Sequence, residues 1–210
     1  MKEIFTSIYE SQYKELWAGS ESRSGIGSSK KATKTIRKHI KKIIKEYDIK
    51  SIADCGCGDF NWMKLIINKL GVRYTGIDIV DDLVEQNNIL FSTDNISFVV
   101  GDITSDIIPK SDLIIARDVL VHFSFDNIKN AISNFSKSGS KYLLLTSFVK
   151  NRNWDALDIK DGQWRTLNFC DSPYFKESII KLFNENCTEG NGSFDDKSLM
   201  LIDLSKTIVD

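Results

Sequence analysis

The sequence predicts an α/β fold in which parallel strands alternate with helices in one doubly wound sheet. Three observations support this prediction: short apolar runs that each end in an aspartate, a glycine-rich turn after the first run, and amphipathic stretches between the runs. In such sheets the carboxyl ends of the strands meet at one edge, and ligands bind in the crevice there. The fold class therefore also predicts where a ligand binds.

The first strand and its turn are the most informative segment. The run 50–54 leads into Asp54-Cys55-Gly56-Cys57-Gly58-Asp59, and residues 60–67 are predicted to form the helix that leaves the turn. Gly56 and Gly58 lack Cβ, so the backbone can take positive φ and bring its N–H groups against a ligand. The turn is typical of nucleotide-type cofactor sites.

The next two strands also end in carboxylates. Strand 72–78 ends in Asp78, about 20 residues beyond the turn, the spacing at which an acid reaches ribose hydroxyls. Strand 96–100 precedes Gly101 and Asp102, which suit an adenine amino group. Three strand ends are thus expected to converge on one crevice.

Through these segments and the fourth run 112–118, residues 48–147 resemble the class I S-adenosylmethionine-dependent methyltransferases. The resemblance implies a Rossmann-like, seven-stranded sheet in the order 3-2-1-4-5-7-6 with helices on both faces, and S-adenosyl-L-methionine as cofactor. The cofactor-binding residues that it implies are Asp54, Gly56, Gly58, Asp78, Ile79, Gly101, Asp102, Ile103 and Arg117. NAD and a purely structural turn are the alternatives, but Asn61 stands where a dinucleotide fingerprint has its third glycine.

The first 47 residues are predicted to form an N-terminal helical lid. An aromatic stretch over 8–17 includes Trp17, a candidate substrate-binding residue, and a Ser/Gly loop over 19–29 follows. Arg23 in this loop could pair with the methionine carboxylate of the cofactor, although an inert loop that caps the next helix is also open. A lid would exclude water from methyl transfer.

An amphipathic helix follows the loop. Its buried face is predicted to hold Ile36, Ile40, Ile43, Ile44 and Tyr47, while its lysines lie mostly elsewhere: Lys30, Lys31, Lys34, Lys38, Lys41, Lys42 and Lys45. The lysines could bind RNA or a phosphorylated substrate. A charge run on such a helix is more often a solvated face.

The fourth strand, 113–116, delivers the candidate catalytic residues Asp118 and His122 to the carboxyl edge, ahead of a helix near 125–135. The sulfonium supplies a reactive methyl group, so the protein must align donor and acceptor and remove a proton from a hydroxyl or ammonium acceptor. His122 has the most suitable intrinsic pKa for this base. A cofactor-side or structural role for His122 remains open.

The remaining residues predict a fifth strand over 141–147, a substrate loop and two closing strands. The loop, 151–169, carries Arg152, Trp164 and Arg165, which suit a sugar face and a phosphate or carboxylate unless its aromatic residues only pack on one another. Residues 177–183, which could also be helical, and 198–204 are predicted to pair antiparallel around Gly190-Asn191-Gly192.

Length and composition suit one domain over 1–210, with a lid (1–47), a cofactor-binding core (48–147) and a C-terminal part (148–210). The net charge of −1 gives no global field that favours nucleic acid. No apolar run approaches the roughly 20 residues of a membrane span and no signal peptide is recognisable, so we expect a cytoplasmic protein without a membrane partner. The four cysteines lack paired C-x-x-C spacing, which favours free thiols over zinc and predicts no metal site.

Residues 151–169, 187–192 and 196–199 loosely resemble small bacterial methyltransferase-domain proteins associated with surface-polysaccharide synthesis. That resemblance implies a sugar or phosphorylated glycan precursor as acceptor. The sequence thus predicts methyl transfer to a hydroxyl of a small molecule. An RNA or protein methyltransferase and a non-catalytic cofactor-binding subunit are the alternatives.

Overall fold

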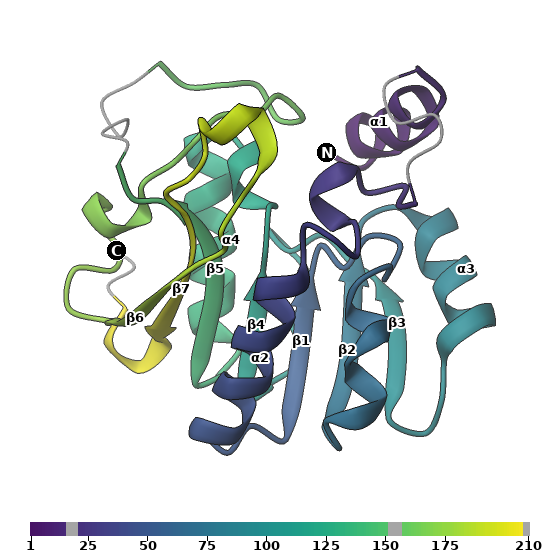
Figure 1. Cartoon of the computed structure of the whole chain (residues 1–210), viewed down its shortest axis with the longest axis horizontal. Coiled ribbons are helices and arrows are strands. Elements are labelled where there is room, and N and C mark those ends of the chain that lie inside the picture. The colour runs from purple at the N-terminus through teal and green to yellow at the C-terminus, as the bar shows by residue number, and fades with distance from the viewer. Residues whose placement is uncertain (16–20, 151–156, 208–210) are drawn as a thin grey trace.

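Seven strands form one mixed sheet in the predicted order, β3-β2-β1-β4-β5-β7-β6 (Figure 1). The computed structural model describes residues 1–15, 21–150 and 157–207, except the side chains of 11–15. The strands are β1 (Ser51–Cys55), β2 (Arg73–Asp78), β3 (Ile96–Val100), β4 (Leu113–Ala116), β5 (Tyr142–Phe148), β6 (Ile179–Asn184) and β7 (Lys197–Asp203). The predicted Rossmann-like α/β class is confirmed.

The first five strands are parallel, so their carboxyl ends share one edge of the sheet, at the top of Figure 1. β7 runs antiparallel to both β5 and β6, as predicted for the closing strands. In this register Lys197, the first residue of β7, lies opposite Phe148, the last residue of β5. The hairpin therefore adds residues to the edge at which β1 to β5 end.

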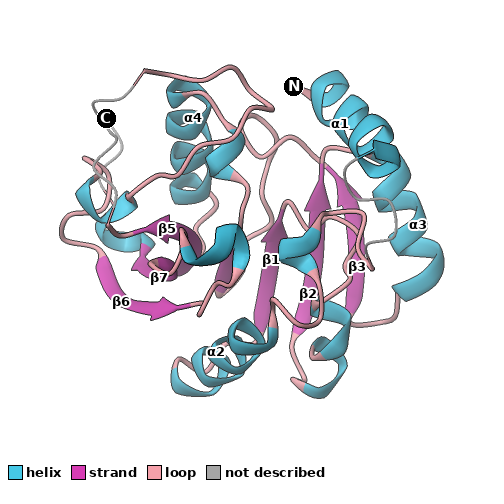
Figure 2. Ribbon diagram, turned by 45° about the horizontal axis from the view of Figure 1, so that its top comes forward, coloured by secondary structure: helices cyan, strands magenta, loops and turns pink. Residues whose placement is uncertain are grey.

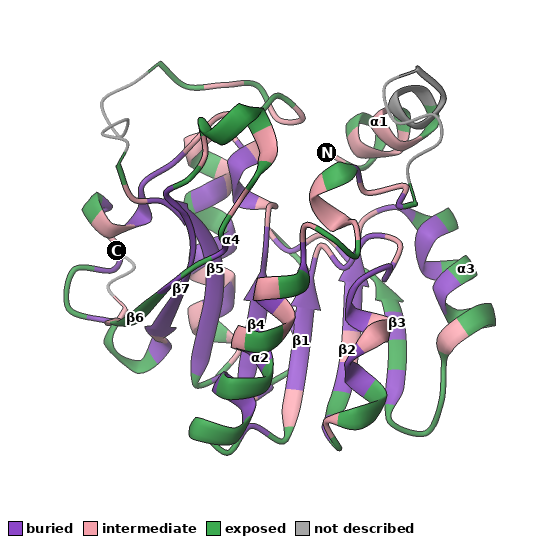
Figure 3. Ribbon diagram, in the orientation of Figure 1, coloured by how far each residue is buried: buried purple, intermediate pink, exposed green. Residues whose placement is uncertain are grey.

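Helices cover both faces of the sheet, with α2 on one side and α4 on the other (Figure 2). The helices are α1 (Lys2–Glu15), α2 (Lys34–Glu46), α3 (Asp81–Phe91) and α4 (Phe125–Lys137). Ile36, Ile40 and Ile43 on α2 and Ile132 and Phe135 on α4 are each fully buried in separate apolar cores. β4 and β5 are buried along their whole length because the sheet is covered twice there (Figure 3).

The helix predicted over 60–67 is wrong as an α-helix. The segment forms turns and two short 3₁₀ helices, Met63–Leu65 and Ile67–Lys69. Phe60 has φ of 56°, which an α-helix does not allow. Residues 60–63, 66 and 67 are buried, so the segment packs through most of its length and not along one helical face.

None of the described helices combines the length and the apolar character needed to cross a bilayer. The four cysteines form no disulfide; Cys55 ends β1 and Cys57 lies in the turn after it, and both are buried. Within the described ranges, no cluster of three or more histidine, cysteine, aspartate and glutamate side chains is arranged to hold a metal ion.

Candidate active site

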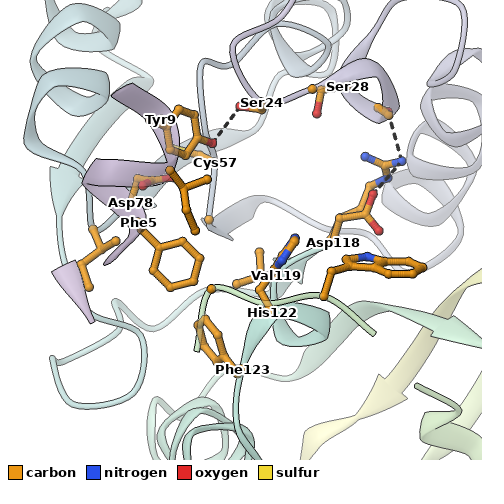
Figure 4. A pocket seen from close by; sticks show the side chains of 18 of the residues that line it. Phe5, Tyr9, Ser24, Ser28, Cys57, Asp78, Asp118, Val119, His122 and Phe123 are labelled. Carbon is orange, nitrogen blue, oxygen red and sulfur yellow. Dashed lines mark hydrogen bonds and ion pairs between the residues drawn. The ribbon is translucent and has the colours of Figure 1, made fainter. Parts of the chain in front are cut away.

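A cavity of about 640 Å³ opens at the carboxyl edge of the sheet, beneath α1 and the loop that follows it (Figure 4). Eleven of the predicted site residues line it: Asp54, Gly56, Asp78, Ile79, Gly101, Asp102, Ile103, Arg117, Asp118, His122 and Trp164. They come from the ends of β1, β2, β3 and β4 and from the loop after β5. The predicted crevice is thus a pocket with residues from every predicted strand end.

The turn after β1 needs both glycines, for different reasons. Gly56 has φ of 80°, and a Cβ there would lie 2.3 Å from a methyl group of Val119. Gly58 has φ of 56°, and a Cβ there would lie 2.2 Å from Ser24 Oγ. Gly56 therefore shapes the pocket wall, whereas Gly58 lies under the N-terminal segment and is not part of the pocket lining.

Two buried carboxylates stand at the ends of β1 and β2. Asp78 accepts hydrogen bonds from the backbone N–H groups of Gly58 (2.9 Å) and Val80 (3.1 Å), but burial outweighs these bonds and raises its pKa. Asp54 accepts a 2.6 Å hydrogen bond from the Tyr74 hydroxyl, and burial raises the pKa of Asp54 to about 7. Both side chains line the pocket, so a bound cation or hydroxyl would meet two desolvated acids.

Asp102 begins a tight turn at the end of β3. Its Oδ1 accepts hydrogen bonds from both the N–H (2.9 Å) and the hydroxyl (2.6 Å) of Thr104. Ile79 and Ile103 line the pocket beside it. This part of the pocket offers apolar walls with one carboxylate at their edge, which suits a flat heterocycle with an amino group.

Asp59 fastens the lid loop, residues 21–29, to the turn after β1. Its carboxylate accepts hydrogen bonds from the hydroxyls of Ser22 (3.0 Å) and Ser24 (3.3 Å) and from the N–H of Arg23 (2.7 Å). The Tyr9 hydroxyl lies 3.0 Å from Ser24 Oγ and ties α1 to the same point. These bonds hold the lid loop beside the pocket, which Ser24 and Ser28 line.

Asn61 supplies a second fastening for the lid loop. Its side-chain amide donates to Glu21 Oε1 (2.9 Å) and to the carbonyl oxygen of Ser28 (3.1 Å). In the sequence, Asn61 stands out only because it replaces the third glycine of a dinucleotide fingerprint. A polar pair, Asp59 and Asn61, within an apolar segment was the signal that could have marked them as lid contacts.

Arg23 does not reach the pocket, contrary to the prediction that it meets the methionine carboxylate. Its guanidinium donates to Gln86 Oε1 on α3 at 2.9 Å, and its backbone N–H donates to Asp59. Arg117 and Lys197 line the pocket instead, and Arg117 donates to the lid carbonyl of Gly27 at 3.2 Å.

A buried charge cluster, Arg117, Asp118, Glu185 and Lys197, forms one wall. Asp118 Oδ2 lies 2.7 Å from Lys197 Nζ and 3.1 Å from an Arg117 nitrogen, and Glu185 Oε2 lies 3.0 Å from Arg117. Burial opposes ionisation of Asp118, but the two cations outweigh it and hold the pKa of Asp118 well below its usual range. Asp118 is therefore a permanent anion and a poor proton acceptor.

Sequence reasoning missed Lys197 and Glu185 in this cluster. Lys197 is 79 residues beyond Asp118, and only the β5–β7 register brings them together. Asp118 itself has φ of 56°, the left-handed region that non-glycine residues seldom adopt. Such local strain is common at functional sites.

His122 projects into the pocket between Val119 and Phe123 (Figure 4). Its Nδ1 lies 3.0 Å from the carbonyl oxygen of Gln163. A carbonyl oxygen only accepts, so Nδ1 carries the proton and neutral His122 has its lone pair on Nε2. Burial lowers the pKa of His122 and outweighs the Gln163 bond and Asp118, which act the other way. The imidazole is therefore neutral at pH 7 and able to accept a proton.

Of the predicted substrate-binding residues, the structure brings Trp164 to the pocket. Trp164 packs edge-on against Phe148 (centroids 6.0 Å apart) and Phe194 (5.3 Å), and about half of it stays exposed. Trp17 and Arg152 lie outside the described residues.

The prediction that Arg165 contacts substrate is not supported. Its guanidinium donates to Asp158 Oδ1 (2.8 Å) and to the carbonyl oxygen of Phe123 (2.9 Å), and it stacks on the Phe125 ring at 4.1 Å. Because these contacts use the planar fork of the side chain, Arg165 holds the loop against the segment after β4 and is absent from the pocket lining.

Comparison with known proteins gives the chemistry. Residues 52–138 match a family model described as a methyltransferase domain. The chain carries an S-adenosylmethionine-dependent methyltransferase domain. The match spans the strand ends, the glycine turn and the candidate base His122, and the methyltransferase uses S-adenosylmethionine as its cofactor. Comparison with curated protein sequences found no match.

Solved structures share the fold of this methyltransferase. Magnesium protoporphyrin IX methyltransferase from Synechocystis PCC 6803, with bound S-adenosylhomocysteine, has a TM-score of 0.63 at 14% identity over 96% of this chain and 98% of that chain. Human N-acetylserotonin methyltransferase in complex with S-adenosylmethionine has 0.63 at 16% identity over 96% of this chain, which spans 59% of the human chain. A TehB-like S-adenosylmethionine-dependent methyltransferase from Corynebacterium glutamicum has 0.55 at 18% identity over 96% and 98% of the two chains.

The pocket residues suit the cofactor. The two desolvated acids Asp54 and Asp78 offer acceptors for polar groups, and Ile79 and Ile103 offer apolar walls for a heterocycle, as a nucleoside bearing a methionine side chain requires. We therefore expect Asp78 to meet the ribose hydroxyls and Asp54 to face the amino-acid end.

We expect Asp78→Ala to weaken binding of S-adenosylhomocysteine by about 2 to 3 kcal/mol, because charge-assisted hydrogen bonds to hydroxyls are lost. Calorimetric titration measures this. Asp78→Asn is the matched control for shape, since it keeps an acceptor for Val80 while removing the charge. Unchanged affinity in a folded Asp78→Ala protein, or a melting temperature raised by NADH instead of S-adenosylhomocysteine, would contradict the expectation.

Proposed function

We propose that the methyltransferase acts on a hydroxyl of a small molecule, a sugar or phosphorylated glycan precursor. The observation that carries this proposal is the lining of the pocket: the lid loop lies along one side, and the aromatic cluster Phe148, Trp164 and Phe194 lines another. A half-exposed indole suits the apolar face of a sugar ring. Gln163 and Glu189 also line the pocket and offer polar atoms for its hydroxyls.

In the proposed reaction, separate residues accept the proton of the acceptor and stabilise the charge that this creates. Bound S-adenosylmethionine supplies an electrophilic methyl group on a sulfonium. His122 Nε2 accepts the proton of the acceptor hydroxyl, since Gln163 keeps Nδ1 protonated and burial keeps the ring neutral. Asp118, held as an anion by Lys197 and Arg117, stabilises the imidazolium that forms.

The lid and the C-terminal part complete the proposed unit. Asp59 and Asn61 hold the lid loop over the pocket, which keeps water from competing with the acceptor. The β6–β7 hairpin contributes Lys197 to the wall, and Glu185 pairs with Arg117 behind it. We therefore propose that residues 1–210 act together as one methyltransferase domain.

A screen with radiolabelled S-adenosylmethionine tests the acceptor class. We expect label to enter nucleotide sugars or sugar phosphates, and Trp164→Ala to raise the KM for that acceptor about tenfold or more, because a stacked ring contributes about 1 kcal/mol or more beyond its contact area. Trp164→Phe is the matched control and should retain most of the affinity. Label that enters RNA or protein fractions and not the sugars would refute a small-molecule acceptor.

A further inference from the structure

The outer face of α2 and the turn before it carry a concentration of positive charge. We call Lys30, Lys31, Lys34, Lys38, Lys41, Lys42 and Lys45 the lysine face. All seven are exposed, while Ile36, Ile40, Ile43 and Ile44 on the opposite side of the helix are buried against the sheet. The lysine face thus points into solvent over its whole length.

Several exposed lysines elsewhere in the chain pair with acids. Lys2 pairs with Asp81, Lys150 with Asp195 and Lys181 with Glu46. Within the part of the chain that the structure describes, no residue of the lysine face forms an ion pair. The protein is nearly neutral as a whole, so this face is a local positive patch.

The pattern works against the helix that carries it. Lys34, Lys38 and Lys42 follow one another on α2 at four-residue spacing, which places like charges side by side. Such pairs destabilise a helix. The helix is held by its apolar side, so the fold does not depend on this row of like charges.

We propose that the lysine face docks on an anionic bilayer surface. Clusters of about four to eight basic residues on an amphipathic helix are typical of segments that bind acidic lipid headgroups. Because the apolar side of α2 is already buried in the core, the contact is electrostatic without insertion. Docking on the surface of a bilayer does not require a helix that spans it.

The side chains favour a headgroup surface over nucleic acid. Nucleic-acid sites use the planar fork of arginine and aromatic rings that stack on bases. The Arg37 guanidinium is hydrogen-bonded to the Lys30 carbonyl at 3.0 Å, and the His39 ring contacts the Asn184 carbonyl at 3.1 Å and lies beside Phe183. The lysine face therefore offers point charges alone.

Docking would also place the active site near the bilayer. Lys30 and Lys31 follow Ser28, which lines the pocket, by two and three residues. An acceptor held at the membrane would then lie close to the lid loop. The docking itself needs neither cofactor nor acceptor, so its test is independent of the proposed function.

Vesicle sedimentation with the full chain tests the proposal. We expect the wild type to sediment with vesicles of equal parts phosphatidylglycerol and phosphatidylcholine in 50 mM NaCl, and not with pure phosphatidylcholine or in 500 mM NaCl. The triple variant Lys34→Glu, Lys38→Glu, Lys41→Glu should bind the anionic vesicles about 100-fold more weakly. It should fold, because the carboxylate introduced at position 38 would lie four residues before Lys42 in a favourable pair.

The matched control changes the same charge elsewhere, at three exposed lysines away from α2: Lys110→Glu, Lys129→Glu and Lys137→Glu. This control should sediment like the wild type. An equal loss in both triple variants would reduce the effect to net charge and overturn the proposal. So would the absence of sedimentation by the wild type, or binding of a 20-nucleotide single strand at concentrations where vesicles are not bound.

Discussion

The His122→Ala variant is expected to turn over about 10²- to 10⁴-fold more slowly than the wild type, with nearly unchanged cofactor affinity. The expectation follows from the Nδ1 contact to Gln163, which leaves Nε2 as the proton acceptor inside the pocket. Single-turnover rates with the acceptor found by the screen, beside calorimetric titration of S-adenosylhomocysteine, separate chemistry from binding. An unchanged turnover rate together with weaker cofactor binding would place His122 in the cofactor site.

The pH dependence gives a second view of the same residue. The neutral form of His122 is the base, so the rate rises with pH through its pKa. Since burial lowers that pKa, the rising limb should lie below pH 6.5 and the rate should be level at neutral pH. His39→Ala is the matched control, because His39 lies on α2 against Phe183 and should leave both rate and limb in place. A limb that survives in His122→Ala would exclude the imidazole as the base.

Asp54→Asn should stabilise the cofactor-free protein against urea by about 4 kcal/mol at pH 8, and much less at pH 4. Burial raises the pKa of Asp54 from 3.8 to about 7, and each pKa unit corresponds to about 1.4 kcal/mol. A raised pKa contributes stability below pH 4, which is lost as pH rises to 7. Asparagine does not titrate and still accepts the Tyr74 hydroxyl, so the difference between variant and wild type should grow from pH 4 to 7 and then stay constant.

Asp112→Asn is a control with the opposite sign. Burial opposes ionisation of Asp112, but hydrogen bonds from Lys50 and Ser51 outweigh it and lower the pKa of Asp112. Its stabilising effect is present above pH 4 and is lost as pH falls. Asp112→Asn should therefore destabilise the protein at neutral pH and approach the wild type in acid. Parallel stability curves for Asp54→Asn and wild type would mean that Asp54 titrates normally.

Most of the sheet could be predicted because its strands are short apolar runs with clear ends. β3 and β4 matched their predicted bounds, and the remaining strands were placed to within two residues. The segment after β1 could not be predicted in the same way. Its apolar residues suit a helix by composition, but Phe60 takes a positive φ and packs against Tyr74 and Phe98, which lie on other strands.

The site was predictable where a residue lies at or soon after a strand end, as Asp54, Asp78 and His122 do. The role of a side chain was not predictable where its partners are distant in the sequence. Arg165 could have faced substrate by composition, yet Phe123 and Asp158 hold it. Lys197 gave no signal within its own segment, since its partner Asp118 is on another strand end.

The bonds between Asp59 and the lid loop have a thermodynamic consequence for turnover. One side of the turn after β1 faces the pocket through Gly56, and the other side holds Ser24 through Gly58 and Asp59. Whatever rigidifies the turn from one side lowers the entropy that the other partner must lose, and this coupling is reciprocal. We therefore expect cofactor and lid loop to order each other, and the demethylated product to leave most easily when these few hydrogen bonds open first.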